Sequence, residues 1–392
     1  MKNLLILIAM ITGNAIFAQN SIDNVLNGIE QNNTTLKALK ETVEAQKLEN
    51  ATGIYLPNPE VEFNYLWGNP NNIGNRNDIS VRQTFDLPTV TGVKKKISDQ
   101  RNSLIELQYR AERLDILLQA RKYCLDLIYY NALKQELVRR LEYAVTLADG
   151  YKTRLDNGDA NILEYNKAQM NLATVKGEMA NVETERQSIL AELKRLNGGV
   201  AVALNDSKYE AVTLPVDFDE WFAQIAQSNP TLEYVRQEVE IAKSQITLNK
   251  SMSLPTFSAG FMREKVVGEA YQGISFGISI PLWENKNRVR QARAALKANE
   301  AKQSDTRLQF CEYLRNIYER AKNLQSTALV YSQSLSSFDN TALLKKALDA
   351  GEISLLDYII ELGLYYNNIN LKLNAEREFQ KTLAEMLRIE KL

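Results

Sequence analysis

The sequence contains one long pattern twice. Residues 155–165 return in similar form as residues 348–358, and Gly158 falls on Gly351, a displacement of 193 residues. The same displacement carries Pro88 onto Pro281. Solenoid units repeat every ~20–50 residues, so a repeat of this length is a whole half-protein. We therefore expect two halves that fold alike: a first repeat over 19–214 and a second over 215–392.

The two halves differ in length at one place. Pro57 and Pro255 are also equivalent, but Pro57 to Pro88 spans 31 residues and Pro255 to Pro281 spans 26. Loops absorb insertions at little cost in stability. The five additional residues of the first half are therefore expected in the asparagine-rich stretch 69–77.

The start of the chain is typical of an exported protein. Lys2, an apolar run over 4–11 and a small residue at Ala18 resemble a secretory signal peptide over 1–18. No cysteine follows the predicted cleavage point, so we expect no lipid at the new N-terminus. No later run of about 18 apolar residues could form a transmembrane helix, so a membrane-spanning part must consist of strands.

Charge and composition exclude several functions. With 47 basic and 48 acidic residues, the net charge is −1, which disfavours nucleic-acid binding. The sequence has no histidine, no nucleophile elbow, no phosphate loop and no metal-ligand spacing, which argues against an enzyme, a cofactor or a metal site. Cys124 and Cys311 are predicted to be buried free thiols, with a disulfide as the alternative in an oxidising compartment.

Two long segments without proline predict long helices. No proline lies in the 126 residues after Pro88 or in the final 111 after Pro281, and apolar residues recur there at every third or fourth position. We predict one antiparallel hairpin over about 93–196, followed by a linker at 197–214, and a second over about 287–390. The first arm of each, 93–157 and 287–350, is predicted as one unbroken helix, roughly 100 Å long at about 1.5 Å per residue.

The turn of each hairpin carries the same signals. Gly158 and Gly351 suit a left-handed residue that ends a helix. Asn161 and Ser354 suit the first cap of the next helix, and Glu164 and Asp357 follow three residues later, as in a capping box. The two acids therefore have two open interpretations, as helix caps or as part of a pore.

Between the paired prolines the hydrophobic period changes from helical to two. Four strands are predicted, two over about 59–87 and two over about 256–281. Each has one apolar and one polar face, as in a membrane barrel or in a half-buried soluble sheet. Four strands cannot close a barrel, and lipid does not tolerate open sheet edges, so membrane insertion requires several chains in one barrel.

This order of elements resembles the outer-membrane efflux proteins of the TolC family. The most specific marks are Asn229-Pro230 with Leu232, the Leu-Pro pairs at 56–57 and 254–255, the two glycine turns, and the Leu-Asn-Gly sequence at 196–198. The first half lacks the proline expected beside Asn33. The resemblance covers the whole mature chain, whose compact length is similar to the heavy-metal cation efflux branch.

The resemblance implies a mainly α, α+β chain that forms a homotrimer. Three chains would share a twelve-stranded β-barrel in the outer membrane, and their helical hairpins would form an α-barrel in the periplasm. The implied partners are a periplasmic adaptor, an inner-membrane transporter and outer-membrane lipid, in a tripartite pump that exports small molecules or metal cations. A periplasmic coiled-coil adaptor or scaffold, and the exit duct of a protein secretion system, stay open as alternatives.

The resemblance also assigns the predicted site residues. The hairpin turns become the periplasmic tips, where a ring of carboxylates would favour cations, although solvated turn charges explain the same acids. The tip and gate candidates are Asp156, Gly158, Asp159, Glu164, Asp349, Gly351, Glu352 and Asp357. The barrel-lumen candidates are Glu60, Glu62, Asn64 and Arg82. The lipid-facing candidates are Phe63, Trp67, Phe261, Phe276 and Trp283, the last of which could instead pack on a helix cap.

Overall fold

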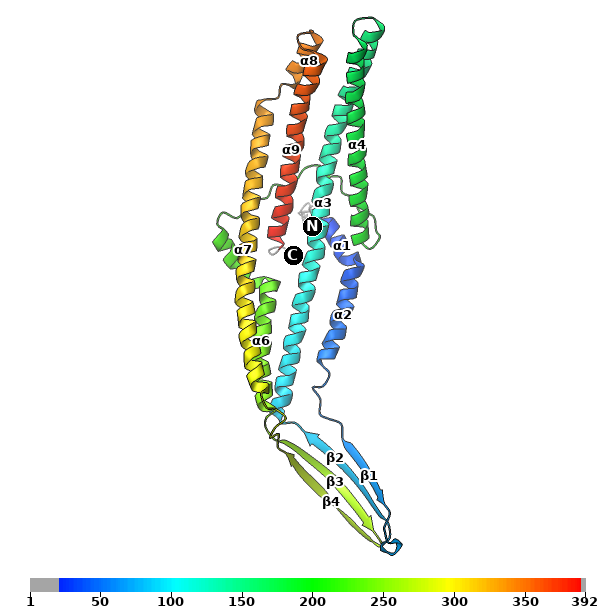
Figure 1. Ribbon diagram of the computed structural model, residues 1–392, viewed down its shortest axis with the longest axis vertical. Coiled ribbons are helices and arrows are strands. Elements are labelled where there is room, and N and C mark those ends of the chain that lie inside the picture. The colour runs from blue at the N-terminus through cyan, green and yellow to red at the C-terminus, as the bar shows by residue number, and fades with distance from the viewer. Residues whose placement is uncertain (1–20, 389–392) are drawn as a thin grey trace, which may run out of the picture. The chain divides into compact units, whose positions relative to one another are not determined.

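The computed structural model describes residues 21–388, so the predicted signal peptide lies outside the described residues. The order of elements is the same in both halves: two helices, two strands and a helical hairpin (Figure 1). In the first half these are α1 (Ser21–Asn32), α2 (Thr34–Asn50), β1 (Glu60–Leu66), β2 (Arg76–Phe85), α3 (Pro88–Asp156) and α4 (Ile162–Leu196). In the second they are α5 (Phe218–Ser228), α6 (Pro230–Ser251), β3 (Thr256–Val266), β4 (Glu269–Ser279), α7 (Arg288–Ser337), α8 (Thr341–Asp349) and α9 (Leu355–Leu387).

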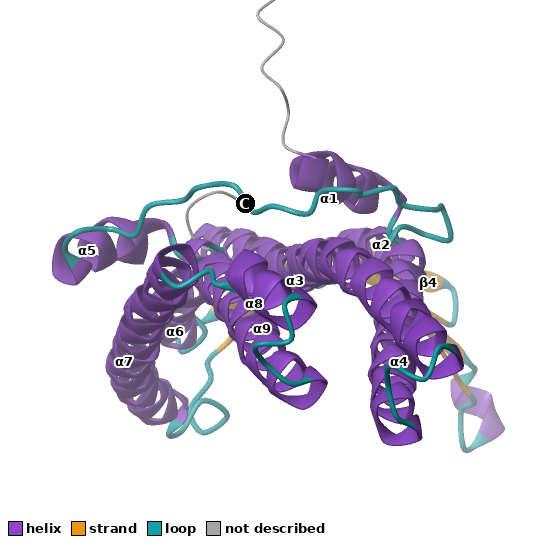
Figure 2. Ribbon diagram, turned by 90° about the horizontal axis from the view of Figure 1, so that it is seen from above, coloured by secondary structure: helices purple, strands orange, loops and turns teal. Residues whose placement is uncertain are grey.

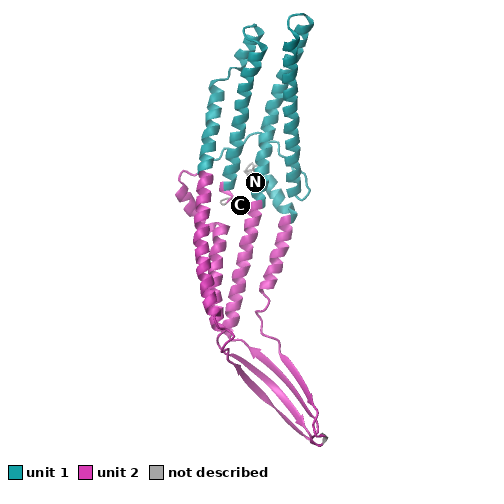
Figure 3. Ribbon diagram, viewed as in Figure 1, with its two compact units in different colours: residues 1–34, 116–214, 319–385 teal, residues 35–115, 215–318, 386–392 magenta. Residues whose placement is uncertain are grey.

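The chain divides into two compact units (Figure 3). Of the described residues, unit 1 contains 21–34, 116–214 and 319–385, and unit 2 contains 35–115, 215–318 and 386–388. Each unit takes segments from both sequence repeats. The repeat boundaries at 214 and 215 therefore stay a prediction, because the compact units do not follow them.

The largest apolar core of unit 1 lies where α1, α3 and α4 meet. Ile29, Leu127 and Leu193, one from each helix, have no exposed surface. Their spacing follows the helical apolar stripes of the sequence, so each helix turns one face inward. Figure 2 shows the chain along its helices, and within this unit α4 lies beside the end of α3 and α9 beside α8.

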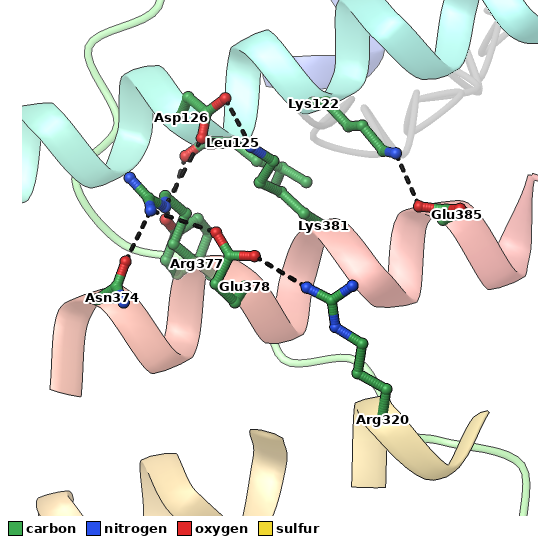
Figure 4. A network of polar contacts seen from close by, with 10 residues as sticks. Lys122, Leu125, Asp126, Arg320, Asn374, Arg377, Glu378, Lys381 and Glu385 are labelled. Atoms are coloured by element: carbon green, nitrogen blue, oxygen red, sulfur yellow. Dashed lines mark hydrogen bonds and ion pairs between the residues drawn. The ribbon is translucent and has the colours of Figure 1, made fainter. Parts of the chain in front are cut away.

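Ion pairs connect α9 to α3 and α7 in the same unit (Figure 4). Lys381 contacts both carboxylate oxygens of Asp126 at 3.0 Å, and Lys122 contacts Glu385 at 2.7 Å. Glu378 contacts Arg320 of α7 at 3.3 Å. These side chains are about a fifth to two thirds exposed, so they align the helices more than they stabilise them.

Unit 2 contains a single four-stranded antiparallel sheet in the order β1-β2-β3-β4. Residues 67–75 join β1 to β2 and include a short 3-10 helix, Asn71–Ile73, whereas Val267 and Gly268 alone join β3 to β4. The longer connection is the stretch to which we assigned the five additional residues. The mainly α architecture with four strands is confirmed.

Two predicted details differ from the structure. The first arm of the second hairpin was predicted as one helix over 287–350, which is wrong, because α7 ends at Ser337 and α8 begins at Thr341. Asp339 accepts hydrogen bonds from the backbone N–H and hydroxyl of Thr341, at 3.1 and 2.7 Å, so a local side-chain bond replaces a helical turn. The first arm of the other hairpin begins five residues earlier than predicted, at Pro88.

Both cysteines are free thiols. Cys124 is fully buried, as predicted, and burial raises the pKa of its thiol to about 12. Cys311 is only half-buried. In the part of the chain that the structure describes, none of the helices has an apolar stretch long enough for a membrane crossing.

Candidate functional site

The sheet of unit 2 separates apolar from polar side chains. Paired residues of antiparallel strands project from the same face, and the register pairs Phe63 with Ile79 and Phe261 with Ile274. Ala259 pairs with Phe276 on this face as well. Of the predicted lipid-facing residues, Phe63, Phe261 and Phe276 therefore share one face, which we call the apolar face.

The opposite face, which we call the polar face, carries the predicted lumen residues. Glu60 pairs with Arg82, Glu62 with Ser80 and Asn64 with Asp78. Arg76 joins two carboxylates across this face, with Asp78 at 2.9 Å and Glu264 at 3.1 Å. The alternation predicted from the sequence thus places all four lumen candidates together.

Neither face of the sheet is covered by the described part of the chain. Every residue of β1 is exposed, and β4 is exposed except at Gly273 and Ser275. Phe63 is 65% exposed and Phe276 is 81% exposed. A contiguous apolar surface of this kind marks a contact with lipid or with another protein, and it is not the half-buried sheet of a soluble domain.

Two tryptophans lie beyond opposite ends of the strands. Trp67 follows β1 and is 79% exposed, with its ring centroid 5.5 Å from that of Tyr65 in an edge-on contact. Trp283 follows β4 and is also 79% exposed, so it does not pack on a helix cap. Amphipathic aromatic rings at both ends of an apolar band are typical of membrane interfaces.

The hairpin turns of unit 1 have nearly the same backbone geometry. Gly158 and Gly351 have φ of 82° and 73°, in the left-handed region that glycine adopts without strain. In each turn the residue after the glycine donates its backbone N–H to a carbonyl of the preceding helix. Asp159 donates to the carbonyl of Arg154 at 2.7 Å, and Glu352 donates to the carbonyl of Ala347 at 2.9 Å. This pattern ends a helix and satisfies its last carbonyls.

The capping interpretation of two acids is confirmed. The amide of Asn161 donates to Glu164 at 3.0 Å, and the amide of Glu164 donates to the Asn161 side chain at 3.0 Å. Ser354 and Asp357 make the same reciprocal pair at 3.3 and 3.1 Å. Both carboxylates therefore hold the first turn of the returning helix.

The other tip acids are exposed. Asp156 lies 3.4 Å from Lys152, and Asp349 lies 2.8 Å from Lys345, so the same lysine–aspartate pair occurs one helical turn before both ends. Asp159 and Glu352 lie in the turns themselves. The structure thus gathers three acids at each turn, of which one caps a helix, one pairs with a lysine and one is an exposed turn residue.

Clefts lie between α3 and the second hairpin in unit 1. One of about 540 Å³ is lined by Tyr143, Tyr151, Arg154, Asp349 and Gly351, among others. It brings residues of both turns to one space. Burial raises the pKa of the Tyr151 hydroxyl, and the guanidinium of Arg154 lies 5.0 Å from the centroid of the Tyr151 ring.

A buried ion pair was missed by sequence reasoning. Arg140, 4% exposed, donates to Glu136 at 3.2 Å and to the side chain of Asn370 on α9 at 3.0 Å. Its guanidinium lies 4.2 Å from the ring centroid of Tyr366, also on α9. The available signal was the glutamate–arginine spacing of four residues inside an apolar stripe that contains Leu137 and Ala144.

A search of residues 21–388 finds no group of three or more histidine, cysteine or acidic side chains placed to hold a metal ion. No protein-family model matches the sequence, and no curated protein matches it either.

Solved structures match nearly the whole chain. A membrane protein from Pseudomonas aeruginosa has a TM-score of 0.77 at 15% identity and covers 94% of this chain and 90% of its own. The CmeC outer membrane channel of Campylobacter jejuni has a TM-score of 0.71 at 15% identity and covers 94% and 85%. The open state of the MtrE outer membrane channel of Neisseria gonorrhoeae has a TM-score of 0.68 at 12% identity and covers 94% and 88%.

These likenesses extend over helices and strands together. The single chain therefore has the mainly helical fold with four strands that solved outer-membrane channels have.

Proposed function

We propose that this chain is the outer-membrane exit duct of a tripartite efflux pump, and that it works as a homotrimer. The sheet crosses the outer membrane, and the hairpins extend into the periplasm toward an adaptor and an inner-membrane transporter. The duct is passive, so the transporter selects the small molecules or cations that pass through it. The fold shared with outer-membrane channels supports this function.

The observation that carries the proposal is the sheet with an uncovered apolar face and two unpaired edges. The eleven residues of β3 and of β4 measure about 36 Å at ~3.3 Å per residue. A tilt of about 40° reduces this to a height of ~27 Å, close to the ~25 Å apolar band of outer-membrane barrels. Pairing β4 of one chain with β1 of the next removes every edge when three chains close a ring of twelve strands.

A periplasmic adaptor or scaffold explains this sheet less well. Such a protein needs long amphipathic hairpins, but it has no use for an apolar face that exposes Phe63 and Phe276 to water.

Cysteine labelling in intact cells tests the placement of the sheet. Ile274 lies on the apolar face and Ser275 on the polar face, so Ile274→Cys should react only with a lipid-soluble maleimide and Ser275→Cys also with a charged one. Both cysteines are introduced into a Cys311→Ser variant, which removes the half-buried native thiol. Cys124 is retained, because the buried thiol of Cys124, with a pKa of about 12, stays protonated and unreactive. Equal labelling of both positions by the charged reagent contradicts the proposal.

We further propose that four exposed acids form a cation-selective gate at the tips: Asp156, Asp159, Asp349 and Glu352. Convergent carboxylates at a narrow opening attract cations and repel anions. Glu164 and Asp357 contribute less, because their oxygens accept hydrogen bonds from the caps. Within the barrel, Glu60, Glu62, Asn64 and Arg82 line the lumen.

Planar-bilayer conductance tests the gate. Changing the four acids to amides should lower the preference for cations and relieve block by multivalent cations. The reciprocal variant Lys152→Gln/Lys345→Gln frees Asp156 and Asp349 from their ion pairs and should raise that preference. If both variants conduct like the wild type, these acids do not control passage.

A further inference from the structure

Acidic and basic residues are distributed differently over the two faces of the sheet. The strands contain nine charged residues, and all five acids lie on the polar face, together with Arg76 and Arg82. The apolar face carries only two charges, Arg263 and Lys265, both of them cations on β3. Exposure to water alone does not explain why one face of a sheet carries cations and no acids.

The two cations lie at one end of the apolar face. Arg263 pairs with Ile79 on one side and Gln272 on the other, and Lys265 pairs with Asn77 and Ala270. On β3 the apolar residues of this face end at Phe261, and Arg263 lies in the last row that still contains apolar side chains of β1 and β2, those of Phe63 and Ile79. This is the end of the sheet that the two hairpin connections close, and the helices continue from the other end.

Both side chains are exposed. Among the described residues, neither makes a salt bridge or a side-chain hydrogen bond. Their Cα atoms are two residues apart on one strand, about 6.6 Å, so the two long side chains reach the same region. Each therefore has its full capacity to donate hydrogen bonds to an external anion.

Position decides what such cations can contact. A lysine or arginine on the lipid face costs ~2–4 kcal/mol at the middle of a bilayer but only ~0–1 kcal/mol near its surface. At the border of an apolar band, a long stem stays in the hydrocarbon and the charge reaches the headgroups. β3 is an interior strand of the sheet, so the edges β1 and β4 remain available for neighbouring chains.

We propose that Arg263 and Lys265 bind the phosphate groups of lipid in the outer leaflet of the membrane. This inference rests on the proposed function, because it needs the closed end of the sheet to face outward and the apolar face to meet lipid. Phosphate oxygens match the donors of both cations, and no acid on that face repels them.

Native mass spectrometry of the detergent-solubilised protein tests the proposal. The probe is lipid A with both phosphates, titrated at low salt without divalent cations. Arg263→Gln/Lys265→Gln should weaken binding about 25-fold, since each cation near an anionic surface accounts for about a fivefold effect. Lipid A without phosphates should bind the wild type and this variant equally.

A matched control removes the same two charges elsewhere in unit 2. Arg293 and Lys297 are exposed on α7, one helical turn apart, and neither forms an ion pair with another described residue. Arg293→Gln/Lys297→Gln should bind lipid A like the wild type. Inorganic phosphate at equal phosphate concentration should not displace the lipid, because the acyl chains hold it against the apolar face.

Three results would overturn the inference: unchanged affinity in Arg263→Gln/Lys265→Gln, displacement of lipid A by inorganic phosphate, or dissociation of the oligomer in that variant with unchanged lipid per chain. The last would make the two cations a subunit contact. The labelling of positions 274 and 275 separates this failure from failure of the proposed function. If Ile274→Cys is protected and lipid binding is still unaffected, only the lipid site is wrong.

Discussion

The two helical hairpins derive from one repeated sequence, yet one is continuous and the other is broken. Residues 338–340 of the second copy fall on 145–147 of the first, where α3 continues to Asp156. In the first copy Thr146 donates to the carbonyl of Glu142 at 2.9 Å, a bond that fits inside a helix. In the second, Asp339 bonds forward to Thr341. The break contains neither proline nor glycine, and a local side-chain hydrogen bond takes the place of a helical turn.

The two hairpins also differ in the ion pairs that their helices form. Arg140 and Glu136 of the first copy form a buried ion pair, and the equivalent residues of the second are Gln333 and Leu329. Glu183 has cationic partners on two helices, whereas its equivalent, Glu376, forms an ion pair only with Lys372 among the residues that the structure describes. The polar contacts at these two positions therefore belong to the copy with the continuous helix, whereas Arg320 and Glu378 join α7 to α9 in the second copy. Three experiments test whether these contacts contribute to stability in one hairpin and not in the other.

The largest effect is expected from Arg140→Met. The substitution removes the buried guanidinium with its hydrogen bonds to Glu136 and Asn370, while Glu136 keeps its ion pair with Arg139 at 2.9 Å, so the expected loss is about 1.5–3 kcal/mol. Denaturant unfolding, followed by helical circular dichroism, measures the change in the free energy of unfolding. The matched substitution Gln333→Met, at an exposed position of the second copy, should change it by less than ~0.5 kcal/mol. Equal effects of the two variants would show that the ion pair does not distinguish the hairpins.

An intermediate effect is expected from Asp339→Ala. The variant loses the hydrogen bonds that Asp339 accepts from Thr341, and a typical intramolecular hydrogen bond contributes about 1 kcal/mol. The same unfolding experiment should show less than ~0.5 kcal/mol for Thr146→Ala in the first copy.

The effect of Asp339→Ala should depend on pH. The hydroxyl and amide of Thr341 hold the pKa of Asp339 below its ordinary value in the folded state. The stabilisation is therefore complete above the unfolded pKa and is lost as pH falls through the folded pKa. A difference between wild type and variant that persists unchanged below both values would rule out the carboxylate as its source.

The smallest effect is expected from Glu183→Gln, and only in acid. Hydrogen bonds led by that from Lys134 lower the pKa of Glu183 to about 2, from an ordinary value of 4.5. The resulting stability is complete above pH 4.5 and disappears as pH falls toward 2. Thermal midpoints between pH 7 and pH 3 should fall less in Glu183→Gln than in the wild type. Glu376→Gln is the control, and an identical fall in both variants would contradict the assignment.

The sequence predicted those features that local chemistry determines. The glycine turns and the caps at Asn161 and Ser354 need residues within four positions of one another, and they are visible in the sequence for that reason. Strand alternation likewise fixed the two faces of the sheet, because the side-chain period of a strand is two. The fold was predictable because both copies repeat these signals.

Features that depend on distant partners were not predictable. Arg140 reaches Tyr366 and Asn370, more than 200 positions along the chain, and no local pattern names them. The break at Asp339 was missed because an aspartate is compatible with a helix as well as with a turn, and the choice follows from the bond to Thr341. Proline-free length therefore indicates where a helix is allowed, and side-chain bonding decides where it stops.

The unpaired edges of the sheet have a consequence for biogenesis. A single chain has free backbone donors and acceptors along β1 and along β4. In the proposed homotrimer, any extended segment nearby would compete with the strand of a neighbouring chain for those groups. The yield of that trimer would then rise with the local concentration of identical chains. Escort factors that cover the two edges before assembly would raise the yield without altering the assembled trimer.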